Sequence, residues 1–242
     1  MFVTGGSVGH NLITKGIYEP RTSLLFSKVV KEGDVVVDFG AHIGYYTLLA
    51  SKIVGKSGRV YSFEPEPENY KILLKNLKLN NALNVFPLQK AVSNKKGFLK
   101  LYLDENDSGG HTIIPDKSKK SIVVECVVPD EFFKEKIDVI KMDVEGAEYL
   151  VLLGMTRLIN ENKDIKIFVE FSPNRVKKTG YHPKAFIDML FKFNFEIFNI
   201  NKCEIVRKYD DLKDEEANLF VARSLEVYKH LLKLLAKIPS EK

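Results

Sequence analysis

The stretch VVVDFGAHIGYYT, residues 35–47, decides the fold of this chain. Its three consecutive valines form a β-branched apolar run, which predicts a strand buried on both faces of a sheet. Gly40 allows a sharp bend and a close approach of the backbone to a ligand, because no Cβ stands in the way. Gly44 lets the following helix start tight against the strand. The stretch therefore predicts a strand, a turn and a helix whose first N–H groups suit polar or anionic ligand atoms.

The residues around these glycines indicate which ligand binds there. The pattern from Asp38 to Gly44 is D-x-G-x-x-x-G. The dinucleotide fingerprint G-x-G-x-x-G requires three glycines, and His42 and Tyr45 stand where its second and third would fall. An aspartate here repels a pyrophosphate and suits a positively charged ammonium group. The pattern favours S-adenosyl-L-methionine over NAD, and the alternative is a purely structural strand–turn–helix unit.

The remaining sequence predicts one doubly wound α/β domain over residues 1–242. The chain is 45% hydrophobic and 29% charged, as in ordinary globular proteins, and is long enough for one sizeable core. Strands alternate with helices until the last strand, which predicts a parallel sheet with one antiparallel member. The predicted strands cover 35–39, 59–63, 84–88, 137–142, 165–171, 195–200 and 217–222, and the predicted helices cover 45–54, 66–79, 147–159 and a segment from Pro183.

The two ends of the chain lie outside this alternation. Four glycines between Gly5 and Gly16 predict a loop-like start to residues 1–33, an approach or lid segment with a short helix over 22–30. Residues 224–242 carry an apolar stripe and a lysine stripe, which predict an amphipathic helix. We expect it to pack on its own domain or on a twin subunit, with a membrane surface as the alternative.

A further region interrupts the alternation between the third and fourth strands. Apolar and polar residues alternate over 97–103, and residues 121–128 are β-branched and apolar, so the two segments predict an added β-hairpin region. Between them the polar segment 104–120 predicts a mobile loop over the edge of the cofactor site, where substrate groups are usually held.

The composition limits which partners the protein is expected to bind and where in the cell it is expected to act. The net charge is +5, which permits an anionic substrate without requiring one. No stripe of Lys and Arg interleaved with aromatic residues is present, so we expect no nucleic-acid partner. The two cysteines, Cys126 and Cys203, are far apart in the sequence and do not have the spacing of zinc ligands, so we expect neither a zinc site nor a disulfide framework. No apolar run approaches a membrane span of about 18 residues, and no signal peptide is recognisable, so a cytoplasmic location is the default expectation.

Acidic residues follow two of the predicted strands, and a small residue follows a third. Glu64 ends the second strand, 64 − 38 = 26 residues after Asp38, where a carboxylate can accept both hydroxyls of a ribose. Ala91 lies in the loop after the third strand, on the side expected for an adenine. Asp143 and Glu145 follow the central strand, where open α/β sheets bind their ligands.

These motifs together resemble the FkbM-type methyltransferases. The resemblance covers roughly Gly16 to Glu170 and rests on DFGAHIGYYT at 38–47, FEP at 63–65, Asn76 with Asn80, and IKMDVEGAE at 140–148. It implies a class I, Rossmann-like methyltransferase dependent on S-adenosyl-L-methionine. The implied sheet has seven strands in the order 3-2-1-4-5-7-6, with strand 7 antiparallel. The implied reaction is O-methylation of a hydroxyl on a sugar, a glycolipid or a polyketide-like natural product.

The resemblance also implies roles for individual residues. Asp38, Gly40 and Gly44 would line the methionine end of the cofactor, Glu64 would hold the ribose, and Asp143 and Glu145 would lie between cofactor and substrate. His42 stands where asparagine is expected, and its imidazole could still donate a hydrogen bond. The predicted cofactor-binding set is Asp38, Gly40, His42, Gly44, Glu64, Ala91 and Asp143.

An alcohol must lose its proton as the new C–O bond forms, so a general base is expected. Asp143 and Glu145 are favoured by position and His111 by its ordinary pKa. Glu170 is a further candidate, and a divalent metal on Asp143, Glu145 and Glu170 is an alternative. We predict no metal site, a small-molecule or glycan hydroxyl as acceptor, and a possible homo-oligomer. The competing functions are RNA methylation, a non-catalytic partner subunit and a dehydrogenase.

Overall fold

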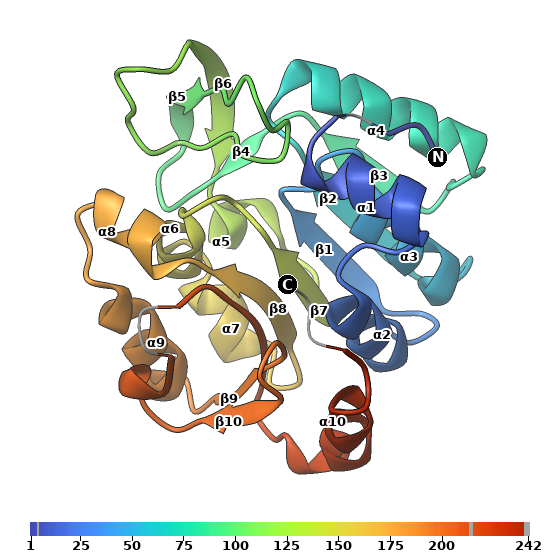
Figure 1. Ribbon diagram of the computed structural model, residues 1–242, viewed down its shortest axis with the longest axis vertical. Coiled ribbons are helices and arrows are strands. Elements are labelled where there is room, and N and C mark those ends of the chain that lie inside the picture. The colour runs from blue at the N-terminus through green and yellow to red at the C-terminus, as the bar shows by residue number, and fades with distance from the viewer. Residues whose placement is uncertain (4, 213–214, 240–242) are drawn as a thin grey trace.

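A computed structural model describes residues 1–3, 5–212 and 215–239, and it consists of a mixed eight-stranded sheet covered by helices on both faces (Figure 1). The strand order is β10-β9-β11-β8-β7-β1-β2-β3. The strands are β1 Val35–Phe39, β2 Arg59–Phe63, β3 Val85–Leu88, β7 Val139–Met142, β8 Lys166–Phe171, β9 Glu196–Asn199, β10 Glu204–Val206 and β11 Ala217–Ala222.

This sheet contains the expected seven-strand order and one strand more. From β3 to β9 the order is the predicted 3-2-1-4-5-7-6, and β11 runs antiparallel to both of its neighbours, β8 and β9. The eighth strand, β10, pairs antiparallel with β9 at the outer edge, and seven strands was therefore an undercount. Cys203 adopts a φ of 57° in the tight turn between them, and a strand of only three residues gives little signal in a sequence.

The helices of the alternating part are α3 Tyr45–Val54, α4 Pro67–Leu79, α6 Glu148–Leu153, α7 Thr156–Glu161, α8 Pro173–Lys178 and α9 Pro183–Lys192, with α1 Ser7–Lys15, α2 Pro20–Val29, α5 Pro129–Phe132 and α10 Lys229–Leu235 completing the set in the described residues. Of the helices in the alternating part, α3, α4 and α9 lie close to their predicted positions, and α8 was not predicted. Short 3-10 helices form at η1 Tyr209–Leu212 and η2 Glu226–Tyr228.

The single helix predicted over 147–159 is wrong, because the chain breaks between α6 and α7. A Cβ on Gly154 would lie 2.6 Å from the carbonyl oxygen of Ser93, so a neighbouring segment packs directly on the break. Helix α7 is then capped by a residue that lies before it in the sequence and outside it. The Asp130 carboxylate accepts hydrogen bonds from the backbone N–H groups of Arg157 and Leu158.

Two predictions at the ends of the chain also need correction. The loop-like start is wrong: α1 forms there, and Gly6 and Gly16, with φ values of 96° and 70°, flank it rather than prevent it. The C-terminal helix begins at Lys229, not at residue 224. The backbone N–H of Leu225 donates instead to the Glu196 carboxylate, and a 3-10 turn follows it.

A second, three-stranded sheet lies at the top of the molecule in Figure 1. The predicted hairpin region forms β5 Gly97–Tyr102 and β6 Ser121–Val127, which pair antiparallel. β4 Ala91–Val92 joins them in parallel with β6, so the loop expected around Ala91 is partly a strand. The register pairs Ala91 with Cys126, and both are buried.

The core has two layers, one on each face of the main sheet. Alternation along β1 sends Val36 to one layer and Val37 to the other, as the unbroken valine run predicts. Side chains of α2, α3, α4 and α10 pack on the first face, and those of α6, α7 and α9 pack on the second. Among the described residues, no helix is both long and apolar enough to span a bilayer.

Candidate active site

The carboxyl ends of β1, β2, β7 and β8 meet at one edge of the sheet and open into a cavity of about 610 Å³. Cofactor and substrate cavities fall in this range of volume. Every residue predicted to act in binding or catalysis, except Gly44, lines this cavity. The topology therefore gathers predicted positions that are up to 170 − 38 = 132 residues apart in the sequence, from Asp38 to Glu170.

The turn after β1 requires glycine for a steric reason. Gly40 adopts a φ of 83°, and a Cβ there would lie 1.8 Å from the carbonyl oxygen of Asp143. The backbone at the end of β7 therefore passes directly against the turn. Gly44 has a φ of 93°, and a Cβ there would lie 2.6 Å from Leu73 on α4. The predicted need for close packing is correct, although the close partner is α4 rather than the preceding strand.

Asp38 places a carboxylate on the inner wall of the cavity. The side chain is buried, and its Oδ2 accepts a 2.6 Å hydrogen bond from Thr47 Oγ1 at the start of α3. Burial raises the pKa of Asp38 to about 6, while Thr47 and Lys141 oppose that rise. An ammonium group bound here would remove the remaining cost of the buried charge.

Glu64 lies beside Asp38, as adjacent parallel strands require. Its Oε2 accepts from the backbone N–H of His42 at 2.8 Å, and its Oε1 accepts from the N–H of Glu66 at 2.9 Å. Burial raises the pKa of Glu64 to about 8. A carboxylate has about four acceptor positions, so two remain for the hydroxyls of a ribose.

His42 connects the glycine turn to the loop at 104–120. Its Nε2 lies 3.0 Å from Ser108 Oγ, and the Ser108 carbonyl accepts from Asn69 Nδ2 at 2.8 Å. Ser108 Oγ also donates to the carbonyl of Gly5. Burial lowers the pKa of His42 to about 4, so its imidazole is neutral near pH 7. The loop is thereby held over the cavity from two sides.

Lys141 is a site residue that sequence reasoning missed. It lies on β7 with only 1% of its side chain exposed, and its Nζ is 3.3 Å from Asp143 Oδ2 and 4.9 Å from the centroid of the Tyr46 ring. Burial alone would lower the pKa of Lys141, but the nearby carboxylates raise it above its usual value. A lysine inside an apolar strand next to an aspartate was the available signal.

Three carboxylates, including the Asp143 partner of Lys141, lie close together in the cavity. One oxygen each from Asp143, Glu145 and Glu170 lies within 4.8 Å of the others. Arg175 on α8 forms an ion pair with Glu145 and lies 3.9 Å from Glu170. Such a group has the composition of a divalent-metal site, but Lys141 and Arg175 already compensate two of its charges. The absence of a metal site stays a prediction.

The protons in this cluster are unevenly distributed. The charge of Asp143, with burial, raises the pKa of Glu170 well above its usual value. Burial would also raise the pKa of Asp143, but Lys141, a hydrogen bond with Glu170 and the charge of Arg175 outweigh it and hold that pKa below the usual value. Asp143 is therefore the ionised member of the pair near neutral pH, and Glu170 is the one that retains a proton.

His111 and Ala91 occupy the outer walls. His111 Nδ1 accepts from the backbone N–H of Asp104 at 2.9 Å, which fixes the ring on the loop, and burial lowers the pKa of His111. Ala91 lines the cavity from the three-stranded sheet. Glu148, by contrast, supports the backbone, because its Oε1 accepts from the N–H groups of Val144 and Gly146.

Comparisons with known proteins identify the family of this chain. Residues 38–197 match the family model described as the Methyltransferase FkbM domain. The chain is 31% identical over 155 residues to Methyltransferase sdnD of Sordaria araneosa, covering 50% of this chain and 60% of sdnD. It is 26% identical over 187 residues to Hexuronic acid methyltransferase AglP of Haloferax volcanii, covering 74% of this chain and 72% of AglP.

A solved structure supports the fold. Methyltransferase FkbM of Methylobacillus flagellatus aligns with a TM-score of 0.52 at 14% identity, covering 88% of this chain and 59% of that one. At this identity the likeness shows the fold alone. The family match, which covers well over half of the chain, is decisive. This chain belongs to the FkbM methyltransferase family and is a methyltransferase.

Proposed function

We propose that this enzyme methylates a hydroxyl group of a sugar, a glycolipid or a small natural product. The observation that carries the proposal is a single cavity in which Asp38 and Glu64 lie on the cofactor side and Asp143 lies beside a proton-bearing partner, Glu170. The names of two relatives support it, because one acts on a hexuronic acid and both are methyltransferases.

The residues present suit the cofactor. Asp38 offers a buried carboxylate with a raised pKa, which a bound ammonium would stabilise in its ionised form. Glu64 retains acceptor positions for two hydroxyls, and Ala91 offers a small apolar surface to a flat ring. When bound, S-adenosyl-L-methionine supplies a methyl group on a positively charged sulfur that leaves as a neutral thioether.

The chain's own residues then position the acceptor and take its proton. A neutral leaving group lets much of the rate come from alignment of the attacking oxygen. Asp143 is the favoured proton acceptor, because it is the ionised member of the carboxyl pair and is held in place by Lys141 and by a hydrogen bond with Glu170. Its low pKa suits it to accept a proton as the C–O bond forms, rather than to remove one beforehand.

The other two predicted bases are less suitable. Glu145 forms an ion pair with Arg175, so its carboxylate already has a charged partner. His111 uses Nδ1 to accept a hydrogen bond from its own loop, and burial lowers its pKa. Both remain candidates for orienting the acceptor.

Calorimetric titration with S-adenosylhomocysteine tests the cofactor half of the proposal. We expect binding by the wild type and at least tenfold weaker binding by Asp38→Ala and Glu64→Ala, since each loses hydrogen bonds to a charged group of about 1.5–3 kcal/mol. Asp188→Ala, at an exposed ion pair on α9, serves as the matched control. A folded wild type that does not bind the ligand contradicts the assignment of this cavity.

Transfer of a labelled methyl group to a panel of sugars and phenolic natural products tests the acceptor half. We expect an O-methyl product, and we expect Asp143→Asn to slow transfer by about a hundredfold or more. The amide keeps the size of the side chain and part of its hydrogen bonding, so ligand binding should fall far less than the rate. Methylation at nitrogen, or an unchanged rate in Asp143→Asn, would contradict the mechanism.

A further inference from the structure

Charge is divided between the inside and the mouth of the cavity. The inner wall, at the ends of the strands, carries the carboxylates Asp38, Glu64 and Asp143. Lysines line the outer part, and they come from two segments that are far apart in the sequence. Lys117 lies on the loop at 104–120, and Lys178 ends helix α8. The acidic inner wall suits a positively charged cofactor. The lysines at the mouth would repel that cofactor, so we assign them to the second substrate.

The two lysine-bearing segments are packed against each other. A Cβ on Gly146 would lie 2.5 Å from Ile114 Cδ1 of the loop and 2.6 Å from Arg175 Cβ of α8, so both segments meet over this glycine. Thr112 Oγ1 also donates to the carbonyl of Glu145 at 2.7 Å, which ties the loop to the end of β7. The mouth is therefore formed by fixed backbone on both sides, although its lysine side chains are exposed.

The other Lys and Arg side chains that line the cavity already have partners, and among them Lys90 pairs with Glu125 and Lys141 with Asp143. Lys119 forms a 2.6 Å ion pair with Asp104, and Arg175 pairs with Glu145. Within the described residues, no ion pair is formed by Lys117 or Lys178. Lys178 lies three residues after Arg175, on the same side of α8, whereas Val176 is buried on the other side. These two lysines are the cations available to a ligand.

One acidic side chain at the mouth is held in place by its own loop. Asp116 accepts hydrogen bonds from the backbone N–H and the hydroxyl of Ser118, and these bonds lower its pKa before Lys119 and Lys178 add to the effect. Within the described residues no ion pair joins Asp116 to Lys117 or Lys178, although the charge of Lys178 is close enough to help lower the pKa of Asp116. An anion entering between loop and helix would meet two unpaired ammonium groups.

We propose that the acceptor carries an anionic group, a carboxylate or a phosphate, and that Lys117 and Lys178 bind this group at the mouth of the cavity. The inference rests on the proposed function, because it concerns the second substrate of the same site. Binding of the anion at the mouth of the cavity would leave the rest of the acceptor directed inward, toward Asp143. Long-range attraction at the mouth would also raise the rate of encounter with an anionic acceptor.

Paired ligands test this inference on the full chain saturated with S-adenosylhomocysteine. Nitrophenyl β-glucuronide is compared with nitrophenyl β-glucoside, and glucose phosphate with glucose, by ligand-observed NMR titration. Each anion should bind about tenfold more tightly than its neutral counterpart, and the difference should shrink in high salt, because two exposed charged contacts are involved. Preference for the glucuronide indicates a carboxylate acceptor, and preference for glucose phosphate indicates a phosphate.

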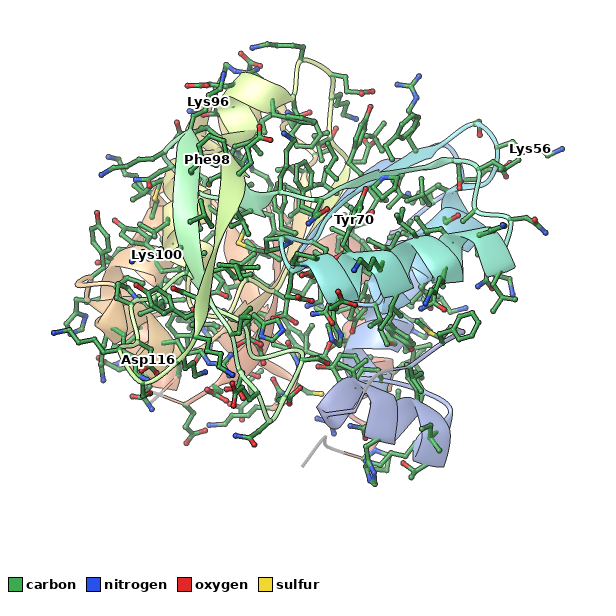
Figure 2. All side chains as sticks on the ribbon, turned by 90° about the horizontal axis from the view of Figure 1, so that it is seen from above. Lys56, Tyr70, Lys96, Phe98, Lys100 and Asp116 are labelled. Carbon is green, nitrogen blue, oxygen red and sulfur yellow. The ribbon has the colours of Figure 1, made fainter. Side chains whose placement is uncertain are left out.

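The double variant Lys117→Ala/Lys178→Ala should lose this preference. Lys56→Ala/Lys96→Ala is the control of equal charge, since Figure 2 shows both lysines well away from Asp116 of the loop. All variants should bind S-adenosylhomocysteine as the wild type does. A wild-type protein that does not bind S-adenosylhomocysteine would contradict the proposed function itself.

Three results would overturn the inference while leaving the cofactor site intact. The first is equal binding of anionic and neutral ligands, which includes no detectable binding of either. The second is an anion preference that survives in Lys117→Ala/Lys178→Ala. The third is binding of a transfer RNA transcript without binding of either small anion, which would assign the lysines to a nucleic acid.

Discussion

Replacing Lys141 by methionine should destabilise the protein in a way that depends on pH. Methionine keeps most of the volume of the lysine stem, so the change removes the charge without opening a large cavity. Lys141 is 1% exposed, and its Nζ lies 3.3 Å from Asp143 Oδ2. Two unit charges at that distance attract each other by about 5 kcal/mol at an effective dielectric constant of about 20.

The net loss is smaller than this attraction, because methionine has no charge to desolvate. Removing one partner of a buried ion pair costs about 3–5 kcal/mol, since the other charge remains buried. The pKa of Lys141 is raised, so its contribution is fully present below the ordinary lysine range and is lost only in strong alkali. At neutral pH the expected loss in free energy of unfolding is therefore about 3–5 kcal/mol.

The sign of the pH dependence follows from Asp143. In the wild type its pKa lies below the usual value, so it contributes stability that is lost only as pH falls through that low pKa. Without Lys141, we expect the pKa of Asp143 to rise, because burial is the largest influence on it and one of the opposing charges is gone, so its ionised form becomes less favourable. The deficit of Lys141→Met should therefore be largest near neutral pH and should shrink as the pH falls and the carboxyl takes up a proton.

Denaturant unfolding at several pH values measures this effect, and Lys136→Met is its control. Lys136 pairs with Asp138 at 2.9 Å in the same i, i+2 arrangement, but 59% of its side chain is exposed. The control should lose less than about 1 kcal/mol. A loss of that small size in Lys141→Met, or a deficit that does not shrink toward acid pH, would refute the account of this buried ion pair.

Three further changes test other parts of the site. Gly40→Ala should cost more than about 3 kcal/mol and abolish titration with S-adenosylhomocysteine, whereas Gly180→Ala should show only the backbone strain of about 1–2 kcal/mol, because its φ is 87° but no atom lies within 4 Å. Thr47→Val should weaken the same titration about fivefold or more, since Asp38 loses a buried hydrogen bond worth about 1–3 kcal/mol. Ser108→Ala should speed proteolytic cleavage in the loop at 104–120, and an unchanged cleavage rate would show that this contact does not hold the loop.

Local chemistry explains which elements could be predicted from the sequence. The strands at 35–39 and 59–63 and the helix at 45–54 were predicted to the residue, because apolar runs are bounded by glycine or by Glu64-Pro65. The break between α6 and α7 could not be predicted, since it depends on packing by Ser93 and on capping by Asp130, which are distant in the sequence.

The candidate site divides in the same way. Asp38, Glu64 and Asp143 could be identified because topology alone puts the ends of neighbouring parallel strands together. Arg175 and Ser108 could not, since their roles come from contacts between a loop, a short helix and strand ends. Glu170 was weighed as a base, but nothing in the sequence showed that its proton is set by the charge of Asp143.

The burial of the site also supports the proposal that a carboxylate, rather than a histidine, accepts the proton. The loop that closes the cavity shields both His42 and His111 from water, and that burial lowers both of their pKa values. A buried histidine that gains a proton becomes a buried cation near a cationic cofactor, which is unfavourable twice over. A carboxylate that gains a proton becomes neutral, and its buried charge is removed. The enclosure that protects the methyl donor from water therefore favours Asp143 over either imidazole as the group that receives the acceptor's proton.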